Sequence, residues 1–244
     1  MANKWHEIWN NRITDLNKIA EGNSSQQIFL ELKRSSGFDV LNDGMSYEAF
    51  YQQYLSTKEM LINKSEQRFG CSVNSVYEVG CGSGANLFLL QEDGYDVGGI
   101  DFSEKLIEAA RKVLHVDDLQ CGEANTLSSE KKYDVLLSNS VFSYFADEAY
   151  ATNVLEKMYR KTRYAIGLID IHDLESKDAF IQYRKREVPN YEERYKELPK
   201  FFYEKSFFVQ FAREHDMDIV FTKSEVEGYW NNNFVFNCFM YKKA

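Results

Sequence analysis

The chain has 244 residues, 44% of them hydrophobic and 15% aromatic, with a formal net charge of −9, so it is long and apolar enough for one sizeable core. The acidic charge argues against a nucleic-acid partner, because such a surface repels phosphate backbones. No apolar run approaches the roughly 20 residues of a membrane span and the first residues lack the apolar core of a signal peptide, so we expect a cytoplasmic protein without a membrane partner.

Residues 1–70 carry helical patterns and no strong strand signal. The run SYEAFYQQYLSTKEMLINKSEQRF has apolar residues at helical spacing and begins with Ser46, a residue type preferred at helix N-caps. We therefore predict an N-terminal helical cap over residues 1–70. Its aromatic residues are expected either to pack in a core or to close over a ligand; they are Trp5, Trp9, Tyr47, Tyr51 and Tyr54.

From residue 71 onward, short apolar runs alternate with helical patterns. We predict strands in five segments, residues 72–79, 95–101, 116–124, 133–145 (where the strand runs into a loop) and 163–173. Helices are predicted between them, over residues 84–94, 103–114 and 147–162, and the second of these begins with Ser103 as its N-cap. Such alternation is typical of a parallel sheet with helices on both faces. Ligands of these sheets lie beyond the carboxyl ends of the strands.

The residue pattern changes again after residue 174. Residues 175–200 are charged and aromatic and predict a helical insertion; their mixed charges are typical of a solvated helix face, although such segments also recognise substrates. Residues 204–217 predict an amphipathic helix. Two further strands, over residues 218–230 and 233–243, are expected to pair antiparallel at one edge of the sheet.

A glycine-rich turn follows the first predicted strand. Gly80, Gly82 and Gly84 come directly after Val79. A strand-to-helix turn of this kind frees backbone N–H groups and aims a helix N-terminus at a ligand. Gly80, Gly82 and Ala85 satisfy the dinucleotide pattern G-x-G-x-x-G/A. By itself this turn leaves the identity of the ligand open.

Acidic residues at the ends of successive strands reduce the number of ligands that fit this turn. Asp101 ends the second strand, about 20 residues beyond the glycines, where a carboxylate accepts hydrogen bonds from ribose hydroxyls. NAD and S-adenosylmethionine both remain open here. Glu78 is unfavourable beside a pyrophosphate but compatible with a cationic ligand. Glu123 is placed to accept from an adenine amino group, and Phe102 to cover an adenine face, unless they are a solvated loop residue and a core residue.

The motifs together resemble those of class I S-adenosylmethionine-dependent methyltransferases. Order and spacing match over residues 73–173, in the segments YEVGCGSGANLFLL, VGGIDFSEKLIEAARK, CGEANTL and YDVLLSNSVFSYF. The resemblance implies a methyltransferase domain over residues 71–244 with an α/β, Rossmann-like fold. Its sheet has seven mostly parallel strands with helices on both faces, and the last strand is antiparallel beside the sixth.

The resemblance also implies contacts with S-adenosylmethionine, the expected cofactor. They are Gly80, Cys81 and Gly82 with the methionine part, Asp101 with ribose, Glu123 and Ala124 with adenine, and Ser138, Asn139 and Ser140 with the cofactor and the acceptor. Glu78 and Phe102 complete the expected cofactor site. The family usually has aspartate where this chain has Glu123, so the adenine contact reaches further here.

Methyl transfer needs a base only if the acceptor is a hydroxyl or a protonated amine. His172, at the end of the fifth predicted strand, is our candidate base, since its ordinary pKa suits neutral pH. Asp170 or Asp173 would orient its ring, and we assign His172 and Asp173 as the catalytic pair. The alternative is a histidine that only ends the strand. Tyr144 and Phe145 are expected either to line the acceptor pocket or to pack in the core.

The sequence therefore predicts an enzyme that methylates oxygen or nitrogen of a small molecule, such as a sugar, a polysaccharide precursor or a secondary metabolite. Four scattered cysteines and one His-Asp pair do not make a metal site. We expect a monomer or a homodimer. A non-catalytic module that keeps the cofactor site is the alternative. An NAD-dependent oxidoreductase would leave Glu78 and Glu123 unexplained.

Overall fold

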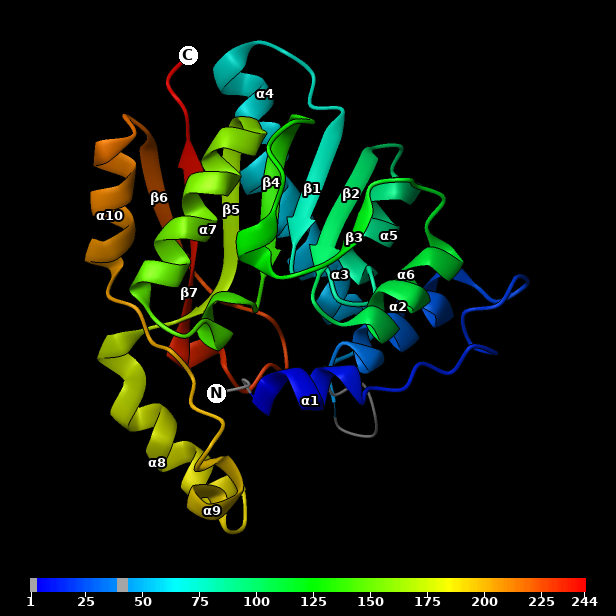
Figure 1. Ribbon diagram of the computed structural model, residues 1–244, viewed down its shortest axis with the longest axis vertical. Coiled ribbons are helices and arrows are strands. Elements are labelled where there is room, and N and C mark those ends of the chain that lie inside the picture. Colours follow the sequence, from blue (N-terminus) through cyan, green and yellow to red (C-terminus); the bar gives the residue numbers. More distant parts are fainter. Residues whose placement is uncertain (1–3, 39–43) are drawn as a thin grey trace.

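The computed structural model of the protein describes residues 4–38 and 44–244 and centres on a seven-stranded sheet (Figure 1). The strand order is β3-β2-β1-β4-β5-β7-β6. Their bounds are Ser75–Val79 (β1), Asp96–Asp101 (β2), Leu119–Cys121 (β3), Tyr133–Asn139 (β4), Thr162–His172 (β5), Asp218–Lys223 (β6) and Val235–Tyr241 (β7). Six strands run parallel, and β7 lies antiparallel between β5 and β6. The predicted fold class is confirmed.

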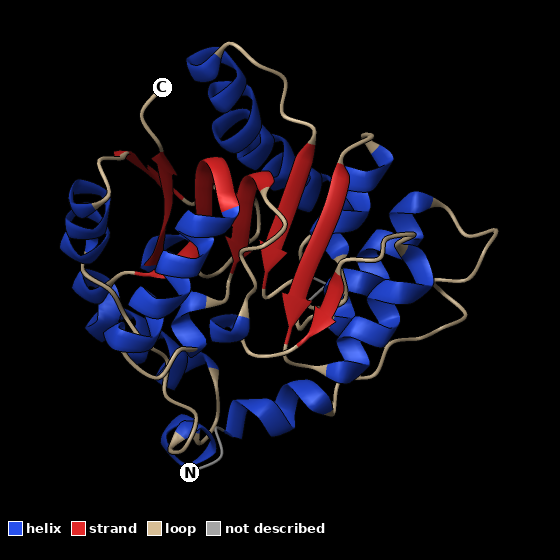
Figure 2. Ribbon diagram, turned by 45° about the horizontal axis from the view of Figure 1, so that its top comes forward, coloured by secondary structure: helices blue, strands red, loops and turns tan. Residues whose placement is uncertain are grey.

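Helices cover both faces of the sheet (Figure 2). One face carries α5 (Ala85–Glu92), α6 (Glu104–Val113), α2 (Ser25–Ser35) and the run α3 (Tyr47–Lys58), a π-helical turn (Glu59–Asn63) and α4 (Lys64–Phe69). The other face carries α7 (Glu148–Lys161) and α10 (Lys205–Glu214). Neighbouring strand residues alternate between the two cores, as Val76 and Tyr77 do.

Helix N-caps predicted from the sequence are present. Ser46 accepts a hydrogen bond from the backbone N–H of Ala49 at 3.1 Å, and Ser103 accepts one from Leu106 at 3.4 Å. Each serine thereby satisfies one of the backbone donors that a helix start leaves free. Gly70 ends α4 in the left-handed conformation and turns the chain into the first strand.

The first 70 residues do not form a separate core. Phe29, Phe50 and Leu61 are buried in the same cluster as Val76 and Leu87 of the sheet layer. In contrast, α1 (Lys4–Asn10) lies across the carboxyl ends of the strands (Figure 1). The domain boundary at residue 70 stays a prediction, and residues 1–3 and 39–43 of the predicted cap lie outside the described residues.

The predicted insertion at residues 175–200 contains two helices, α8 (Lys177–Glu187) and α9 (Tyr191–Tyr195), which extend beyond the strand ends (Figure 1). The predicted strand 218–230 ends earlier, at Lys223. The side chain of Asn232 holds the following loop, since its Oδ1 accepts from Ser224 Oγ and its Nδ2 donates to the Val226 carbonyl. This loop, residues 224–234, turns toward the carboxyl ends of the strands.

In the part of the chain that the structure describes, no helix is both long and apolar enough to cross a membrane.

Candidate functional site

A cavity of about 1090 Å³ lies at the carboxyl ends of the parallel strands. Residues from β1, β2, β4 and β5 line its inner wall, and residues from α1, α8 and the loop 224–234 line the outer wall. Pockets that hold one drug-sized molecule measure roughly 300–1,000 Å³. The cavity is therefore large enough for two ligands side by side, as a reaction between a cofactor and a second molecule requires.

The glycine-rich turn forms part of the cavity wall. Gly80 has a φ of +74° and Gly82 a φ of +54°, a region that favours glycine. A Cβ at Gly80 would lie 2.2 Å from a methyl carbon of Val141, and one at Gly82 would lie 2.7 Å from Ser36 Oγ. The glycines are thus required by close packing inside the protein, and this packing brings Gly80, Cys81 and Gly82 to the cavity.

Asp101 is held by the backbone of the two loops beside it. Its Oδ2 accepts from the N–H of Gly82 and its Oδ1 from the N–H of Ser103, both at 2.9 Å. Burial raises the pKa of Asp101, and these two N–H groups oppose that effect. Each oxygen keeps a further lone pair, and the residue lines the cavity. The carboxylate is therefore fixed in place for a ligand with hydroxyl donors.

Glu78 is a buried acid with one open acceptor atom. Its Oε1 accepts from Asn86 Nδ2 at 2.6 Å, while its Oε2 is buried without a hydrogen-bond partner among the described residues. Burial raises the pKa of Glu78 to about 8, against the effect of Lys33. Lys33 donates to Asn86 Oδ1 at 3.0 Å. A buried unpaired carboxylate oxygen at a cavity wall suits a ligand with a cationic N–H donor.

The third acid, Glu123, lies beside an aromatic pair. Tyr150 donates to Glu123 Oε2 at 3.0 Å, and His6 Nε2 lies 3.2 Å from Glu123 Oε1. The His6 ring stacks on Phe102 with a centroid distance of 4.3 Å. Ala124 lines the cavity next to these residues. Helix α1 is thereby attached to Glu123 and Phe102, two of the three residues predicted to contact adenine.

Strained backbone marks the ends of β4 and β5. Ser140 and Asp170 are non-glycine residues with φ of +60° and +63°, a conformation that persists where the surroundings impose it. Ser140 Oγ and Tyr229 Oη donate to Asp170 Oδ2 at 2.5 and 2.7 Å, and Asn231 Nδ2 donates to Oδ1 at 3.3 Å. Burial raises the pKa of Asp170. Ser140, Asp170 and the predicted Asn139 all line the cavity.

Two predicted site residues do not line the cavity. Ser138 is buried, and its hydroxyl donates to the Val79 carbonyl at 2.9 Å, which ties β4 to β1. Asp173 accepts from Lys205 Nζ at 2.6 Å and from the N–H of Glu175 at 3.1 Å. These contacts give Ser138 and Asp173 structural roles, so the prediction that they touch a ligand is not supported.

His172 lines the cavity but does not have the environment of a base. Its ring lies about 5.0 Å from the rings of Phe180 and Phe202, and burial holds its pKa well below the ordinary value. Its Nε2 lies 3.3 Å from Asn231 Nδ2, and its Nδ1 is buried without a partner among the described residues. Neither predicted carboxylate bonds the ring. The assignment of His172 and Asp173 as a catalytic pair stays a prediction, and no contact among the described residues supports it.

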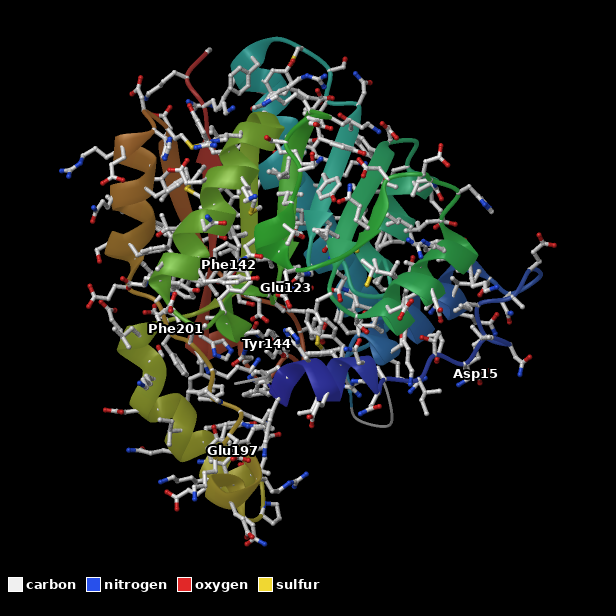
Figure 3. The ribbon with its side chains drawn as sticks, in the orientation of Figure 1. Asp15, Glu123, Phe142, Tyr144, Glu197 and Phe201 are labelled. Carbon is white, nitrogen blue, oxygen red and sulfur yellow. The ribbon has the colours of Figure 1, made fainter. Side chains whose placement is uncertain are left out.

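Lys200, which belongs to no sequence motif, also lines the cavity. Its Nζ lies 3.2 Å from the centroid of the Tyr144 ring and 5.0 Å from that of Trp5, and donates to Ser143 Oγ at 3.3 Å. Figure 3 shows Tyr144 beside α1, near the strand ends. Lys200 ends the charged segment that was attributed to a solvated helix face, so composition gave no signal for it.

The loop 224–234 is a second part of the cavity wall that local pattern does not predict. The sequence indicates a strand end and a short polar connection there. Instead Tyr229, Trp230 and Asn231 line the cavity. The expectation that Tyr144 and Phe145 line the pocket is met, since both belong to the cavity wall. Among the described residues, no group of three or more His, Cys, Asp or Glu side chains is arranged to hold a metal ion.

The family model described as a methyltransferase domain matches residues 77–163. Two curated relatives are named malonyl-[acyl-carrier protein] O-methyltransferase. The Priestia megaterium protein is 29% identical over 132 residues, which cover 52% of this chain and 47% of the relative. The Bacillus cytotoxicus protein is 28% identical over 110 residues, which cover 40% and 37%. The chain thus spans less than half the length of these relatives.

Solved structures share the fold. A plantazolicin methyltransferase in complex with S-adenosylhomocysteine aligns with a TM-score of 0.63 at 19% identity, over 99% of this chain and 97% of that one. The magnesium protoporphyrin IX methyltransferase of Synechocystis PCC 6803, also with S-adenosylhomocysteine bound, aligns with a TM-score of 0.59 at 14% identity, over 90% and 100%. At these identities the likeness concerns the fold.

Proposed function

The chain carries a class I S-adenosylmethionine-dependent methyltransferase domain, and we propose that it transfers the methyl group to an oxygen or nitrogen atom of a small molecule. The NAD alternative does not fit this family. The names of the relatives describe the substrates of those proteins only. We therefore infer the acceptor of this chain from the residues of its own cavity.

The observation that carries the proposal is the row of acids along β1, β2 and β3. Glu78, Asp101 and Glu123 follow one another across the cavity wall, beside the glycine-rich turn. The open Oε2 of Glu78 suits the α-ammonium group of the cofactor, and the fixed carboxylate of Asp101 suits its ribose. Glu123 and Phe102 are the predicted adenine contacts, and Tyr150 and His6 contact them in this structure. The residues present therefore fit S-adenosylmethionine.

S-adenosylmethionine supplies the methyl group on a sulfonium, so the C–S bond breaks as the new bond to oxygen or nitrogen forms, and S-adenosylhomocysteine remains. The chain's main task is to align the two molecules and to keep water out. If the acceptor has a hydroxyl or ammonium group, a proton must also be removed. We assign that step to Asp170, whose Oδ1 accepts one long hydrogen bond and whose pKa burial raises.

Calorimetric titration of S-adenosylhomocysteine into the purified protein tests the cofactor site. We expect micromolar binding, weakened about 10- to 100-fold in Asp101→Ala, because charge-assisted hydrogen bonds to the ribose are lost. Asp173→Ala is the matched control, since this aspartate also follows a strand but lies outside the cavity. Equal losses in both variants, or no binding by a folded protein, would contradict the assigned site.

A single-turnover assay tests the reaction itself. Cofactor with a labelled methyl group is mixed with the enzyme and a pooled metabolite extract, and products are separated by size. We expect label in small molecules. Label only in protein or nucleic acid would exclude a small-molecule acceptor, and cofactor binding without any transfer would favour the non-catalytic module.

A further inference from the structure

The ionic groups along the cavity are unevenly distributed, with Lys33 as a cation near Glu78 and Asp170 as an acid near Lys200. The acids Glu78, Asp101 and Glu123 lie at the ends of β1, β2 and β3, in the half assigned to the cofactor. On the side of the helical insertion, the lining residues include Arg184, Arg194 and Lys200, together with the aromatic residues Phe180, Tyr191, Tyr195 and Trp230. A cationic cofactor explains the acidic half. The cationic half calls for a second, anionic ligand.

The basic side chains of helix α8 differ in their surroundings. Lys185 and Arg186 form ion pairs with Glu192 and Glu187, as expected for a solvated helix face. Arg184 lines the cavity instead, and in the described residues it forms no ion pair. Its guanidinium lies 4.8 Å from the centroid of the Trp230 ring, and its Nη2 donates to the Tyr195 hydroxyl at 3.0 Å. The guanidinium is thus held in place by neutral aromatic groups, with its charge uncompensated.

Lys200 is the second uncompensated cation of this half. Its contacts within the cavity are aromatic rings and a serine hydroxyl, and it has no ion pair in the described part of the chain. Burial, together with the charge of Arg184, lowers the pKa of Lys200 to about 7, while Asp170 across the cavity acts in the opposite direction. An oxyanion bound between the two side chains would restore the charged form of Lys200.

We propose that the acceptor is a small, ring-bearing carboxylic acid whose carboxylate is held by Lys200 and Arg184. This inference rests on the proposed function, which makes this half the acceptor site. The planar guanidinium matches a carboxylate geometrically, and the surrounding rings of Tyr144 and Trp230 suit a flat, apolar framework. Lys200 and Arg184 are assigned as binding residues for the acid group.

Binding of the acid should be coupled to protonation of Lys200. Lys200 is largely uncharged above its pKa of about 7 in the free protein, so an acid that binds at pH 8 has to bring a proton with it. Its affinity should fall by up to roughly tenfold per pH unit above that value. The groups that face Lys200 and enter this balance are Asp170 and His172 from β5 and Arg184 from α8. Tyr144 below the ammonium stays protonated, because burial raises its pKa.

Equilibrium binding of model acids tests the proposal without knowledge of the natural acceptor. Benzoate and naphthoate, each beside its neutral carboxamide, are titrated by calorimetry into the protein saturated with S-adenosylhomocysteine. We expect the acids to bind at least about tenfold more tightly than the carboxamides at pH 6.5. At pH 8, titrations in buffers of different ionisation enthalpy should report uptake of nearly one proton per acid bound.

Variants distinguish the contribution of Lys200 and Arg184 to acid binding from that of the general positive charge of the segment. Lys200→Met and Arg184→Met should each weaken the acids about tenfold or more, and Lys200→Arg should keep the affinity while removing the pH dependence, since arginine stays charged. Lys196→Met and Lys185→Met, which change lysines outside the cavity lining, should bind the acids normally.

Two results would overturn the inference: carboxamides that bind as tightly as their acids, or no acid binding at millimolar concentration in a protein that binds S-adenosylhomocysteine. Failure of the proposed function itself is distinguishable, because S-adenosylhomocysteine would then not bind in the first step.

Discussion

The two halves of the cavity are built in different ways. In the acidic half, residues sit at the ends of parallel strands, and backbone N–H groups fix them, as Gly82 and Ser103 fix Asp101. In the cationic half, Lys200 and the loop 224–234 are placed by contacts between distant segments. Trp5 Nε1 donates to the Pro199 carbonyl at 3.0 Å, and Lys4 forms an ion pair with Glu197, which Figure 3 shows near α9.

This difference shows how one fold serves many acceptors. The sheet supplies a cofactor site whose geometry follows from the backbone, while segments added before, within and after the sheet supply the other wall. Changes in the acidic half should therefore affect cofactor binding and folding. Changes in the cationic half should affect the acceptor with little effect on the cofactor.

The largest effect on methyl transfer is expected for Asp170→Asn, which changes a residue between the acidic and the cationic half of the cavity. The amide keeps the shape of the side chain but cannot take up a proton, so we expect methyl transfer to fall about 100-fold or more. The dissociation constant of S-adenosylhomocysteine should change less than about threefold, because Asp170 lies outside the acidic row. Single-turnover label transfer and calorimetry measure the two quantities. An unchanged rate would mean that the acceptor reaches the site without a proton to lose.

Gly80→Ala tests the rigidity of the acidic half. The substitution places a Cβ at positive φ and 2.2 Å from Val141, so we expect the free energy of unfolding to fall by about 2–4 kcal/mol, with weakened cofactor binding. Gly228→Ala is the matched control from the cationic half. Its φ of +72° is nearly the same, but nothing lies within 4 Å of the added Cβ, so the loss should be about 1 kcal/mol. Urea unfolding measures both.

Equal losses in the two glycine variants would mean that backbone conformation alone, and not the contact with Val141, requires glycine at position 80.

The pH dependence of the two halves should have opposite signs. The pKa of Glu78 is raised to about 8 in the free protein, so below that pH the carboxyl is mostly neutral and must lose a proton to bind a cationic ligand. Affinity for S-adenosylhomocysteine should therefore rise from pH 6 to pH 8, by up to about tenfold per unit, whereas affinity for a carboxylic acid falls above pH 7. Calorimetry across this range measures the trend.

Glu78→Gln should flatten the rise, and Glu104→Gln, which changes an exposed glutamate outside the cavity lining, should keep it. A flat profile in the wild-type protein would show that Glu78 does not titrate together with cofactor binding.

The smallest effect is expected on the outer side of the cationic half. Lys185→Met removes the exposed ion pair with Glu192, which solvent screens strongly, so the midpoint of thermal unfolding should stay within about 1 °C. Binding of the model acids should also be unchanged. Weaker acid binding in this variant would indicate that the general charge of the insertion, and not Arg184 and Lys200, attracts the acceptor.

The sequence by itself predicted the acidic half of the cavity. The glycine turn, Asp101 at the next strand end and Glu123 after the third strand follow one another at fixed spacing, and parallel strands bring their carboxyl ends to one edge. Local pattern also predicted the two capping serines, the insertion helices and the antiparallel last strand. These features depend on backbone geometry within a few residues, or on strand order, and both leave a signature in the sequence.

Only the tertiary structure decided the rest of the site. Whether Ser138 faces the cavity or the Val79 carbonyl, whether His172 meets water or phenylalanine rings, and whether Lys200 is solvated depend on which distant segments pack against each residue. A charged segment such as 175–200 has the same composition whichever of its cations points inward. Burial and pairing set the chemistry of these side chains, and they result from long-range contacts that no local motif records.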